Sequence, residues 1–175
     1  MDGIGSRTAK TLLQHFEEPQ EIFERTDVFK TKIKGFSKER IKMLNRSKAL
    51  IEAEYQMKYI EKHDIRVLFY GDEDYPKRLM ECPDAPIVLY AKGNFNSNPS
   101  KTISIVGTRR VTNYGEKLVK ELIDNLKEHN VQIVSGLAYG VDIKAHRYAL
   151  KNNLSTIGVL GHGLDRLYPN DHKNT

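Results

Sequence analysis

Arg109 stands in a glycine turn, and this combination of residue types suits a phosphate group. The turn belongs to the first of three segments in which an apolar, strand-like run breaks directly into a glycine turn, at residues 103–110, 131–140 and 156–163. Glycine lets backbone N–H groups approach a ligand because no Cβ stands in the way, and arginine offers a planar fork with a permanent charge. The sequence therefore predicts that this turn binds phosphate.

The spacing of the three segments indicates which elements must position the turn. Helical patterns fill the two gaps, and this alternation favours an α/β fold with a parallel, doubly wound sheet. One helix is expected from Thr112 or Asn113 to about His129, and the next from Asp142 to about Asn152. The buried face of the first helix is expected to carry Leu118, Leu122, Ile123 and Leu126. In such sheets the turns after the strands emerge at one edge, where the ligand crevice forms.

The number of strands bears on how much of the domain is present. Three parallel strands are about half of the usual complement of a doubly wound sheet. We therefore expect that the chain lacks the C-terminal part of this domain. The first residues already lie in a glycine hairpin, which suggests that the N-terminus is short as well.

The N-terminal region has a helical, basic character. Residues 2–16 and 33–41 each pair a glycine turn with a helix start, as in helix-hairpin-helix units, and Ser6 or Thr8 is expected to cap the first helix. Such hairpins can present backbone amides to nucleic-acid phosphate, and a purely structural helical domain is the open alternative. The stretch from Lys30 to Lys48 is strongly basic, which fits either a nucleic-acid surface or a solvated helix face.

A long helix and two strands are expected to follow. The pattern from Ser37 to His63 is helical, with an apolar stripe that we interpret as core. The stripe consists of Ile41, Leu44, Ala49, Leu50, Ala53, Met57 and Ile60. Strands are expected at residues 65–70 and 86–90, and the acidic turn at residues 72–74 is interpreted as solvated rather than metal-binding.

Composition limits the class of protein. The net charge of +5 and the pI near 9.2 are a mild indication of a polyanionic partner. No stretch is apolar enough for a membrane span or a signal peptide, so we expect a soluble, cytoplasmic protein. The single cysteine, Cys82, can form no internal disulfide.

Possible catalytic or metal-binding residues are few. Asp142 and His146 share a helix face at spacing i, i+4, but two ligands are too few for a metal site. We interpret Asp142 as a helix cap and His146 as a hydrogen-bond partner of nearby loop backbone. His162, between two glycines, is expected to face the crevice. No nucleophile, base and orienting group can be assembled, which indicates a protein that is not an enzyme.

Several segments, in the same order, resemble the DNA processing protein A family (DprA, also called Smf). They are residues 71–76, 86–93, 104–109, 134–142 with Ala145 and His146, and 161–165 with Tyr168 and Pro169. The resemblance covers nearly the whole chain. It implies a small all-α helix-hairpin-helix or SAM-like domain at residues 1–62. An extended Rossmann domain, incomplete at its C-terminal end, is implied at residues 63–175.

The resemblance also implies a function. Proteins of this family bind incoming single-stranded DNA during natural transformation, protect it from nucleases and help to load the RecA recombinase. They usually act as homodimers and require no metal or small-molecule cofactor. The partners expected for this chain are therefore single-stranded DNA, RecA and a second copy, with no membrane and no cofactor.

The resemblance can be carried over to particular residues. Arg109 matches the arginine that contacts DNA phosphate in the family. The family also places a lysine shortly after a Tyr-Pro pair, and here Asn170 follows that pair, so Lys173 is the candidate by proximity. The predicted single-stranded DNA site consists of Gly107, Thr108, Arg109, Ser135, Gly136, Gly161 and Lys173, with no catalytic residue and no metal ligand.

Two other classes of protein have related folds. A phosphoribohydrolase of the lysine-decarboxylase-like type would need a Pro-Gly-Gly-x-Gly-Thr loop and a catalytic glutamate after the next strand. The N-terminal hairpins and the acidic turn at residues 71–76 argue against it. A generic NAD-binding domain would need G-x-G-x-x-G after the first strand, where residues 107–112 read Gly-Thr-Arg-Arg-Val-Thr instead.

Overall fold

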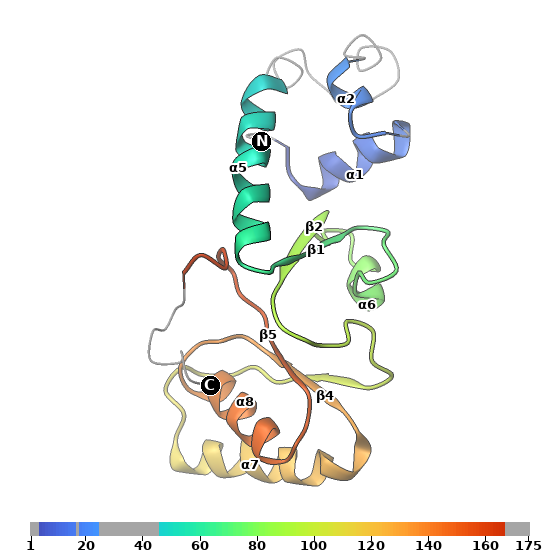
Figure 1. Ribbon diagram of the computed structural model, residues 1–175. Coiled ribbons are helices and arrows are strands. Elements are labelled where there is room, and N and C mark those ends of the chain that lie inside the picture. Colours follow the sequence, from blue (N-terminus) through green and yellow to red (C-terminus); the bar gives the residue numbers. More distant parts are fainter. Residues whose placement is uncertain (1–3, 17, 25–45, 167–175) are drawn as a thin grey trace. The chain divides into compact units, whose positions relative to one another are not determined.

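The structure, a computed structural model, describes residues 4–16, 18–24 and 46–166. The chain forms two compact units, Met1–Gly93 and Asn94–Thr175 (Figure 1). The family resemblance implies a domain boundary between residues 62 and 63, which differs from this division after Gly93 and stays a prediction.

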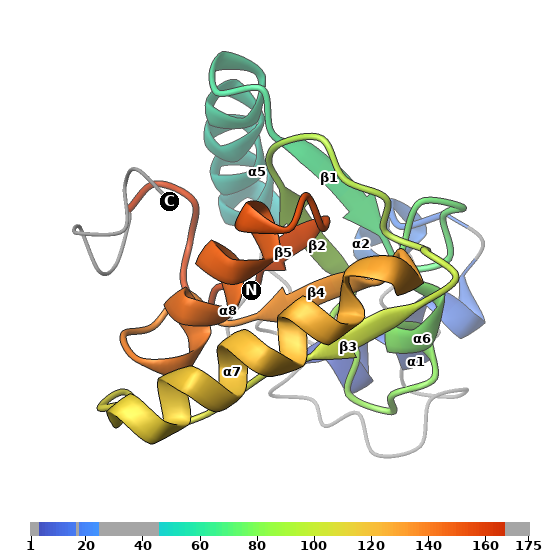
Figure 2. The same cartoon turned by 90° about the horizontal axis from the view of Figure 1, so that it is seen from below.

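The C-terminal unit contains a parallel sheet with the strand order β3-β4-β5. Its elements in chain order are β3 (Thr102–Ser104), α7 (Asn113–Leu126), the 3-10 turn η1 (Lys127–His129), β4 (Gln132–Ser135), α8 (Val141–Lys151) and β5 (Thr156–Gly158). The connections from β3 to β4 and from β4 to β5 run across the sheet in the same direction. Since such connections are right-handed, both place their helix on the same face of the sheet, and Figures 1 and 2 show α7 and α8 together on one side. The predicted α/β alternation with parallel strands is confirmed.

Local sequence explains where the two helices begin. The Thr112 side chain accepts a hydrogen bond from the Gly115 N–H at 3.1 Å, so Thr112 is the N-cap of α7. Helix α8 begins after Gly140, which has a φ of 83°. No side chain caps α8, so the interpretation of Asp142 as its cap is wrong. Asp142 instead lies in the first turn, where a carboxylate interacts favourably with the helix dipole.

The core of this unit is made by one face of each helix and by the strands. It consists of Ile105, Val119, Ile123, Val131, Ile133, Val141, Ala145, Ala149 and Leu154. The prediction for α7 is right for Ile123 and for Leu126, which packs against this core, and wrong for Leu118 and Leu122, which are each 46% exposed. Leu118 and Leu122 each precede a buried residue by one position, which turns them by about 100° from the buried stripe.

The N-terminal unit combines helices with a two-stranded antiparallel sheet, β1-β2. Its described elements are α1 (Ser6–His15), α2 (Glu21–Glu24), α5 (Arg46–Lys62), β1 (Arg66–Phe69), α6 (Lys77–Met80) and β2 (Val88–Ala91). The two strands lie where the sequence predicted them. Gly5 occupies the cap position of α1 without a side-chain bond, so the expected cap by Ser6 or Thr8 is wrong. The second hairpin, at residues 33–41, lies outside the described residues.

Contacts of α1 and of the strand connection hold this unit together. The Lys10 ammonium donates to the Cys82 carbonyl at 3.3 Å and lies 4.4 Å from the centre of the Tyr70 ring. Tyr75 is fully buried, and its hydroxyl donates to the Pro86 carbonyl at 2.7 Å. Within the described part of the chain, no helix combines the length and apolar character that a membrane crossing requires.

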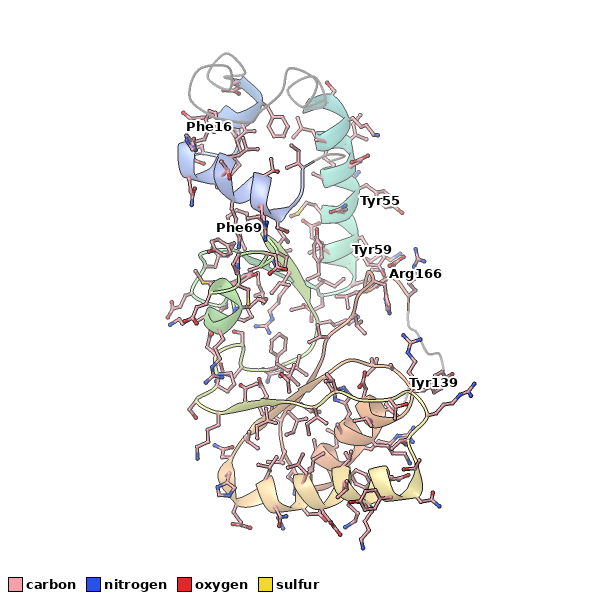
Figure 3. The ribbon with its side chains drawn as sticks, turned by 180° about the vertical axis from the view of Figure 1, so that it is seen from behind. Phe16, Tyr55, Tyr59, Phe69, Tyr139 and Arg166 are labelled. Atoms are coloured by element: carbon pink, nitrogen blue, oxygen red, sulfur yellow. The ribbon has the colours of Figure 1, made fainter. Side chains whose placement is uncertain are left out.

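Helix α5 differs from its prediction. The apolar stripe was expected to be core, but Leu50 is 47% exposed and Met57 is 51% exposed. Tyr55, which also projects from this helix in Figure 3, is 75% exposed. Ala53 is exposed as well, whereas Ala49 and Ile60 are half-buried, so the predicted stripe is buried only in part. Ile41 and Leu44, the first two members of the stripe, lie outside the described residues.

Candidate functional site

The turn after β3 lies at the surface and is held against the start of α8. Gly107, Thr108 and Arg109 are all exposed. The Val141 N–H donates to the Thr108 carbonyl at 3.1 Å. A Cβ at Gly107 would lie 2.6 Å from Cγ2 of Val141, closer than side chains tolerate. Packing against α8 therefore requires glycine at this position, while the next two side chains remain open to solvent.

Two further features fix the backbone of this turn. A Cβ at Gly140 would overlap the Thr108 carbonyl and the backbone of Arg109, so the two segments approach each other at a second glycine. The Thr108 hydroxyl oxygen accepts a hydrogen bond from the Arg110 N–H at 3.1 Å. The Arg110 carbonyl is 3.5 Å from the same oxygen, a distant acceptor for the hydroxyl hydrogen. That hydrogen can therefore turn to a phosphate oxygen.

The turn after β4 is built differently, because its polar groups are satisfied internally. Ser135 is 3% exposed, and its hydroxyl donates to the Ile105 carbonyl at 2.6 Å. The Gly136 carbonyl is bonded to Nε2 of His146 at 2.8 Å. A Cβ at Gly136 would lie 2.5 Å from a carboxylate oxygen of Asp142. Ser135 and Gly136 thus have structural partners, and their predicted role at DNA stays a prediction.

His146 joins two strands from within the core. It is 3% exposed, and its Nδ1 lies 2.7 Å from the Thr156 hydroxyl oxygen. A carbonyl can only accept, so Nε2 carries the hydrogen that is donated to Gly136. In the neutral ring, Nδ1 then accepts from Thr156. The interpretation of His146 as a partner of loop backbone is confirmed.

A hollow of about 620 Å³ opens beside the β3 turn. Its lining combines that turn with the loop before α8 and one face of α8: Arg109, Arg110, Val111, Tyr139, Gly140, Ile143, Lys144 and Arg147. Four of these side chains are cationic and none is a carboxylate. Tyr139 is 41% exposed, and in Figure 3 it lies at the edge of the C-terminal unit, on the loop that leads into α8. The arrangement suits an anion that also carries an aromatic or apolar part.

Only part of the positive charge in the hollow is neutralised. The Lys144 ammonium lies 2.6 Å from the Glu116 carboxylate, which also accepts from the Tyr148 hydroxyl at 2.7 Å. The hydrogen bonds from Lys144 and Tyr148 lower the pKa of Glu116, and the bond to Glu116 raises the pKa of Tyr148. Glu116 therefore stays ionised at a lower pH than an ordinary glutamate.

The arginines differ from Lys144 in this respect. Among the residues that the structure describes, Arg109, Arg110 and Arg147 form no ion pair. The hollow therefore presents three guanidinium groups to a ligand.

The other predicted positions are scattered. Gly161 is exposed, and a Cβ there would meet nothing within 4 Å. His162 is half-buried, and its Nδ1 lies 2.9 Å from the Gly163 carbonyl. Lys173 and most of the basic stretch lie outside the described residues. Lys48, the last residue of that stretch, lies 3.8 Å from Glu52 on the same helix.

The acidic turn lines a separate hollow of about 490 Å³ in the N-terminal unit. Its Asp72 carboxylate accepts a hydrogen bond from the Phe69 N–H at 3.2 Å. In residues 4–16, 18–24 and 46–166, no three histidine, cysteine or carboxylate side chains are grouped so as to hold a metal ion.

Besides Arg109, four residues with polar side chains line the basic hollow, and sequence reasoning missed them all: Arg110, Tyr139, Lys144 and Arg147. One signal was available for two of them. Lys144 and Arg147 are spaced i, i+3 on α8, so they share a helix face, and α8 begins at the edge where the crevice was expected. Glu116 was not recognised as the partner of Lys144 because the two residues lie on different helices.

A parallel sheet with glycine turns at its carboxyl edge, beside arginines that form no ion pair with any described residue, defines a Rossmann-like unit suited to anionic ligands. Residues 66–175 match the sequence model described as DNA recombination-mediator protein A, which covers more than half of the chain, and the chain therefore belongs to this family. The family resemblance read from the sequence is thus confirmed.

Relatives and solved structures agree with this assignment. Protein Smf of Synechocystis is 34% identical over 172 residues, which cover 95% of this chain and 43% of the relative. DNA processing protein DprA of Streptococcus pneumoniae is 43% identical over 102 residues, covering 58% of this chain and 36% of the relative. The X-ray structure of DNA processing protein A from Streptococcus pneumoniae superposes with a TM-score of 0.68 at 29% identity.

That alignment covers 98% of this chain and 58% of the solved chain, and it supports the predicted fold class. The chain spans less than half the length of these two curated relatives.

Proposed function

We propose that this chain binds single-stranded DNA, without strong sequence preference, as part of a protein that processes DNA for recombination. The observation that carries the proposal is the basic hollow, which presents three guanidinium groups and no carboxylate. Phosphate is the group that every nucleotide shares, and arginine forks match its oxygens. The description of the family, DNA recombination-mediator protein A, and the name of one relative, DNA processing protein DprA, support a role with DNA.

Each residue of the predicted site has a role in this proposal. Arg109 contacts a phosphate, and the Thr108 hydroxyl donates to the same group. Gly107 and Gly140 bring the turn and the start of α8 together, which sets the direction of Arg109. Ser135 and Gly136 support the carboxyl edge of the sheet beneath the DNA, because the Ser135 side chain is buried.

The remaining predicted positions complete the path of the strand. Gly161 allows the DNA backbone to pass close to the turn after β5, since a Cβ there would meet nothing within 4 Å. Lys173 adds a further phosphate contact. Loading of RecA, homodimer formation and action in the cytoplasm complete the proposed role.

Titration of oligo-dT by fluorescence anisotropy at several salt concentrations tests the binding. Neutralising about three phosphates gives a slope near −0.7 per charge, so affinity should fall roughly 20-fold from 50 to 200 mM salt. A duplex of the same length should bind more weakly. Salt-independent binding, or a preference for duplex, would contradict the proposal.

We also propose that the chain is not an enzyme. Thr156 and His146 form a hydroxyl–imidazole pair, but His146 is 3% exposed and its other ring nitrogen is bonded to the Gly136 carbonyl, so the pair belongs to the core and is not open to a substrate. Incubation with AMP should release no adenine. Adenine release that disappears in Arg109→Ala would favour the phosphoribohydrolase alternative.

A further inference from the structure

We propose that the basic hollow holds one nucleotide of the strand, with the Tyr139 ring stacked on its base and Arg147 bound to a phosphate different from the one at Arg109. This inference rests on the proposed binding of single-stranded DNA. It adds a base-stacking residue and a second phosphate contact, neither of which belongs to the predicted site.

The size and lining of the hollow fit a nucleotide better than a bare phosphate. A volume of about 620 Å³ lies in the usual range for sites of small organic ligands. An isolated phosphate would need only the arginines, whereas the lining also includes an aromatic ring and two aliphatic side chains, Val111 and Ile143. Ile143 is buried, so it forms a fixed apolar wall.

Tyr139 has the chemistry for stacking. Its side chain is 41% exposed and lines the hollow together with the three arginines. Every base has a π-face, so stacking on an aromatic ring tolerates any sequence. Tyr139 immediately precedes Gly140, which contacts the backbone of the β3 turn, so the ring is anchored next to Arg109.

Arg147, rather than Lys144, is the second phosphate contact. Lys144 is neutralised by Glu116 at 2.6 Å, while Arg147 is exposed and forms no ion pair within the described part of the chain. Helix α8 rises by about 1.5 Å per residue, so Arg147 lies about 9 Å along the axis from Val141. The Val141 N–H is hydrogen-bonded to the β3 turn, which carries Arg109. Arg109 and Arg147 therefore lie at different positions along the hollow.

A tryptophan reporter tests the stacking directly, because the sequence contains no tryptophan. In Tyr139→Trp, fluorescence should be quenched when oligo-dT binds and should stay unchanged when an abasic oligonucleotide of equal length binds. The matched control is Tyr114→Trp on α7, which is 71% exposed and does not line the hollow. Its fluorescence should change with neither oligonucleotide.

Affinities of the purified protein give the second readout. Tyr139→Ala should weaken oligo-dT binding roughly 5- to 150-fold and leave abasic binding unchanged. Arg147→Gln should weaken both oligonucleotides alike and make binding less dependent on salt. Thermal melting of each variant checks that the fold is kept.

The outcomes separate this inference from the proposed function. If the unchanged protein binds neither oligonucleotide, the proposed function itself fails and the inference fails with it. If the unchanged protein binds both, but Tyr139→Ala loses equal affinity for both or none for either, the stacking role alone is overturned. Unaltered binding and salt dependence in Arg147→Gln would overturn the second phosphate contact.

Discussion

The turns after β3 and β4 look alike in sequence and differ in the structure. Both follow an apolar strand, both contain glycine, and both lie at the carboxyl edge of the sheet. The β3 turn exposes Thr108 and Arg109, whereas the β4 turn binds its own polar groups to Ile105 and His146. A glycine turn therefore does not by itself indicate a ligand site.

Internal hydrogen bonds distinguish the structural β4 turn from the β3 turn. In the β4 turn the Ser135 hydroxyl and the Ser135 and Gly136 carbonyls have internal partners, so the turn rigidifies the edge. In the β3 turn the charge of Arg109 has no carboxylate partner among the described residues. Unpaired positive charge at a rigid edge is the property that a polyanion can use. The following predictions separate these two roles.

Removal of His146 should have the largest effect, and it should act on stability. His146→Ala leaves the Gly136 carbonyl and the Thr156 hydroxyl without their buried partner and opens a cavity, which should cost about 3 kcal/mol or more. Urea denaturation measures this loss. The neighbour Arg147→Ala, on the exposed side of α8, should change the free energy of unfolding by at most about 0.5 kcal/mol. Equal losses in the two variants would contradict a structural role for the β4 turn.

Adding a Cβ to each of two glycines should distinguish packing from access. Gly107→Ala brings the new Cβ within 2.6 Å of Val141 and should cost about 1–3 kcal/mol by overpacking. Gly161→Ala meets nothing within 4 Å and should leave the melting temperature unchanged. Weaker oligo-dT binding by Gly161→Ala would then locate the DNA backbone at the β5 turn. Normal binding would remove Gly161 from the site.

The two hydroxyl groups of the compared turns should respond in opposite ways. Ser135→Ala removes a buried donor to Ile105, so it should destabilise the protein by about 1 kcal/mol and leave DNA binding unchanged. Thr108→Val should weaken DNA binding several-fold. It also removes the acceptor of the Arg110 N–H, so stability should change by up to about 1 kcal/mol. Melting curves and DNA titrations on both variants provide the check. A reversal of this pattern would show that the β4 turn, and not the β3 turn, touches DNA.

The smallest effect is expected at Glu116, and it should be a gain. Glu116→Gln frees the Lys144 charge, so oligo-dT should bind a few-fold more tightly and the salt slope should steepen by about 0.7. The matched control is Glu121→Gln, which removes an exposed carboxylate that pairs with Lys117 on α7, away from the hollow. Identical gains in both variants would mean that only net charge matters.

The same pair predicts a dependence on pH. Because the pKa of Glu116 is lowered in the folded protein, the pair should persist as the pH falls through the ordinary glutamate range. The stability that it contributes is fully present above that range. It begins to fall as the pH enters that range, because the glutamate of the unfolded chain then takes up a proton, and it is lost once the pH has fallen through the folded pKa.

The sequence was sufficient for the features that depend on local patterns. Apolar runs that end in glycine turns predicted all three parallel strands, and Thr112 was one of two residues expected to cap α7. The buried face of α7 was predicted only in part, because Leu118 and Leu122 have the same helical spacing as Val119 and Ile123. Only the packing against the sheet decides which of these neighbouring stripes is buried.

The site was less predictable because it depends on contacts between distant segments. Arg109 could be recognised from its turn, but Tyr139 and Arg147 meet it only through the packing of α8. The internal bonds of Ser135 were also invisible, since its partner Ile105 lies thirty residues earlier on another strand segment. In α5 the error was the reverse. The spacing of the apolar residues predicted a buried stripe, but most of its described members are exposed.

Binding and stability of Arg109→Ala, measured side by side, are the strictest test of DNA binding at the β3 turn. Loss of a charge-assisted hydrogen bond worth about 1.5–3 kcal/mol should weaken oligo-dT binding roughly 10- to 150-fold. The melting temperature should stay unchanged because Arg109 is exposed and forms no ion pair within the described residues. Unchanged affinity, or a loss of affinity matched by an equal loss of stability, would contradict the assignment of DNA binding to the β3 turn.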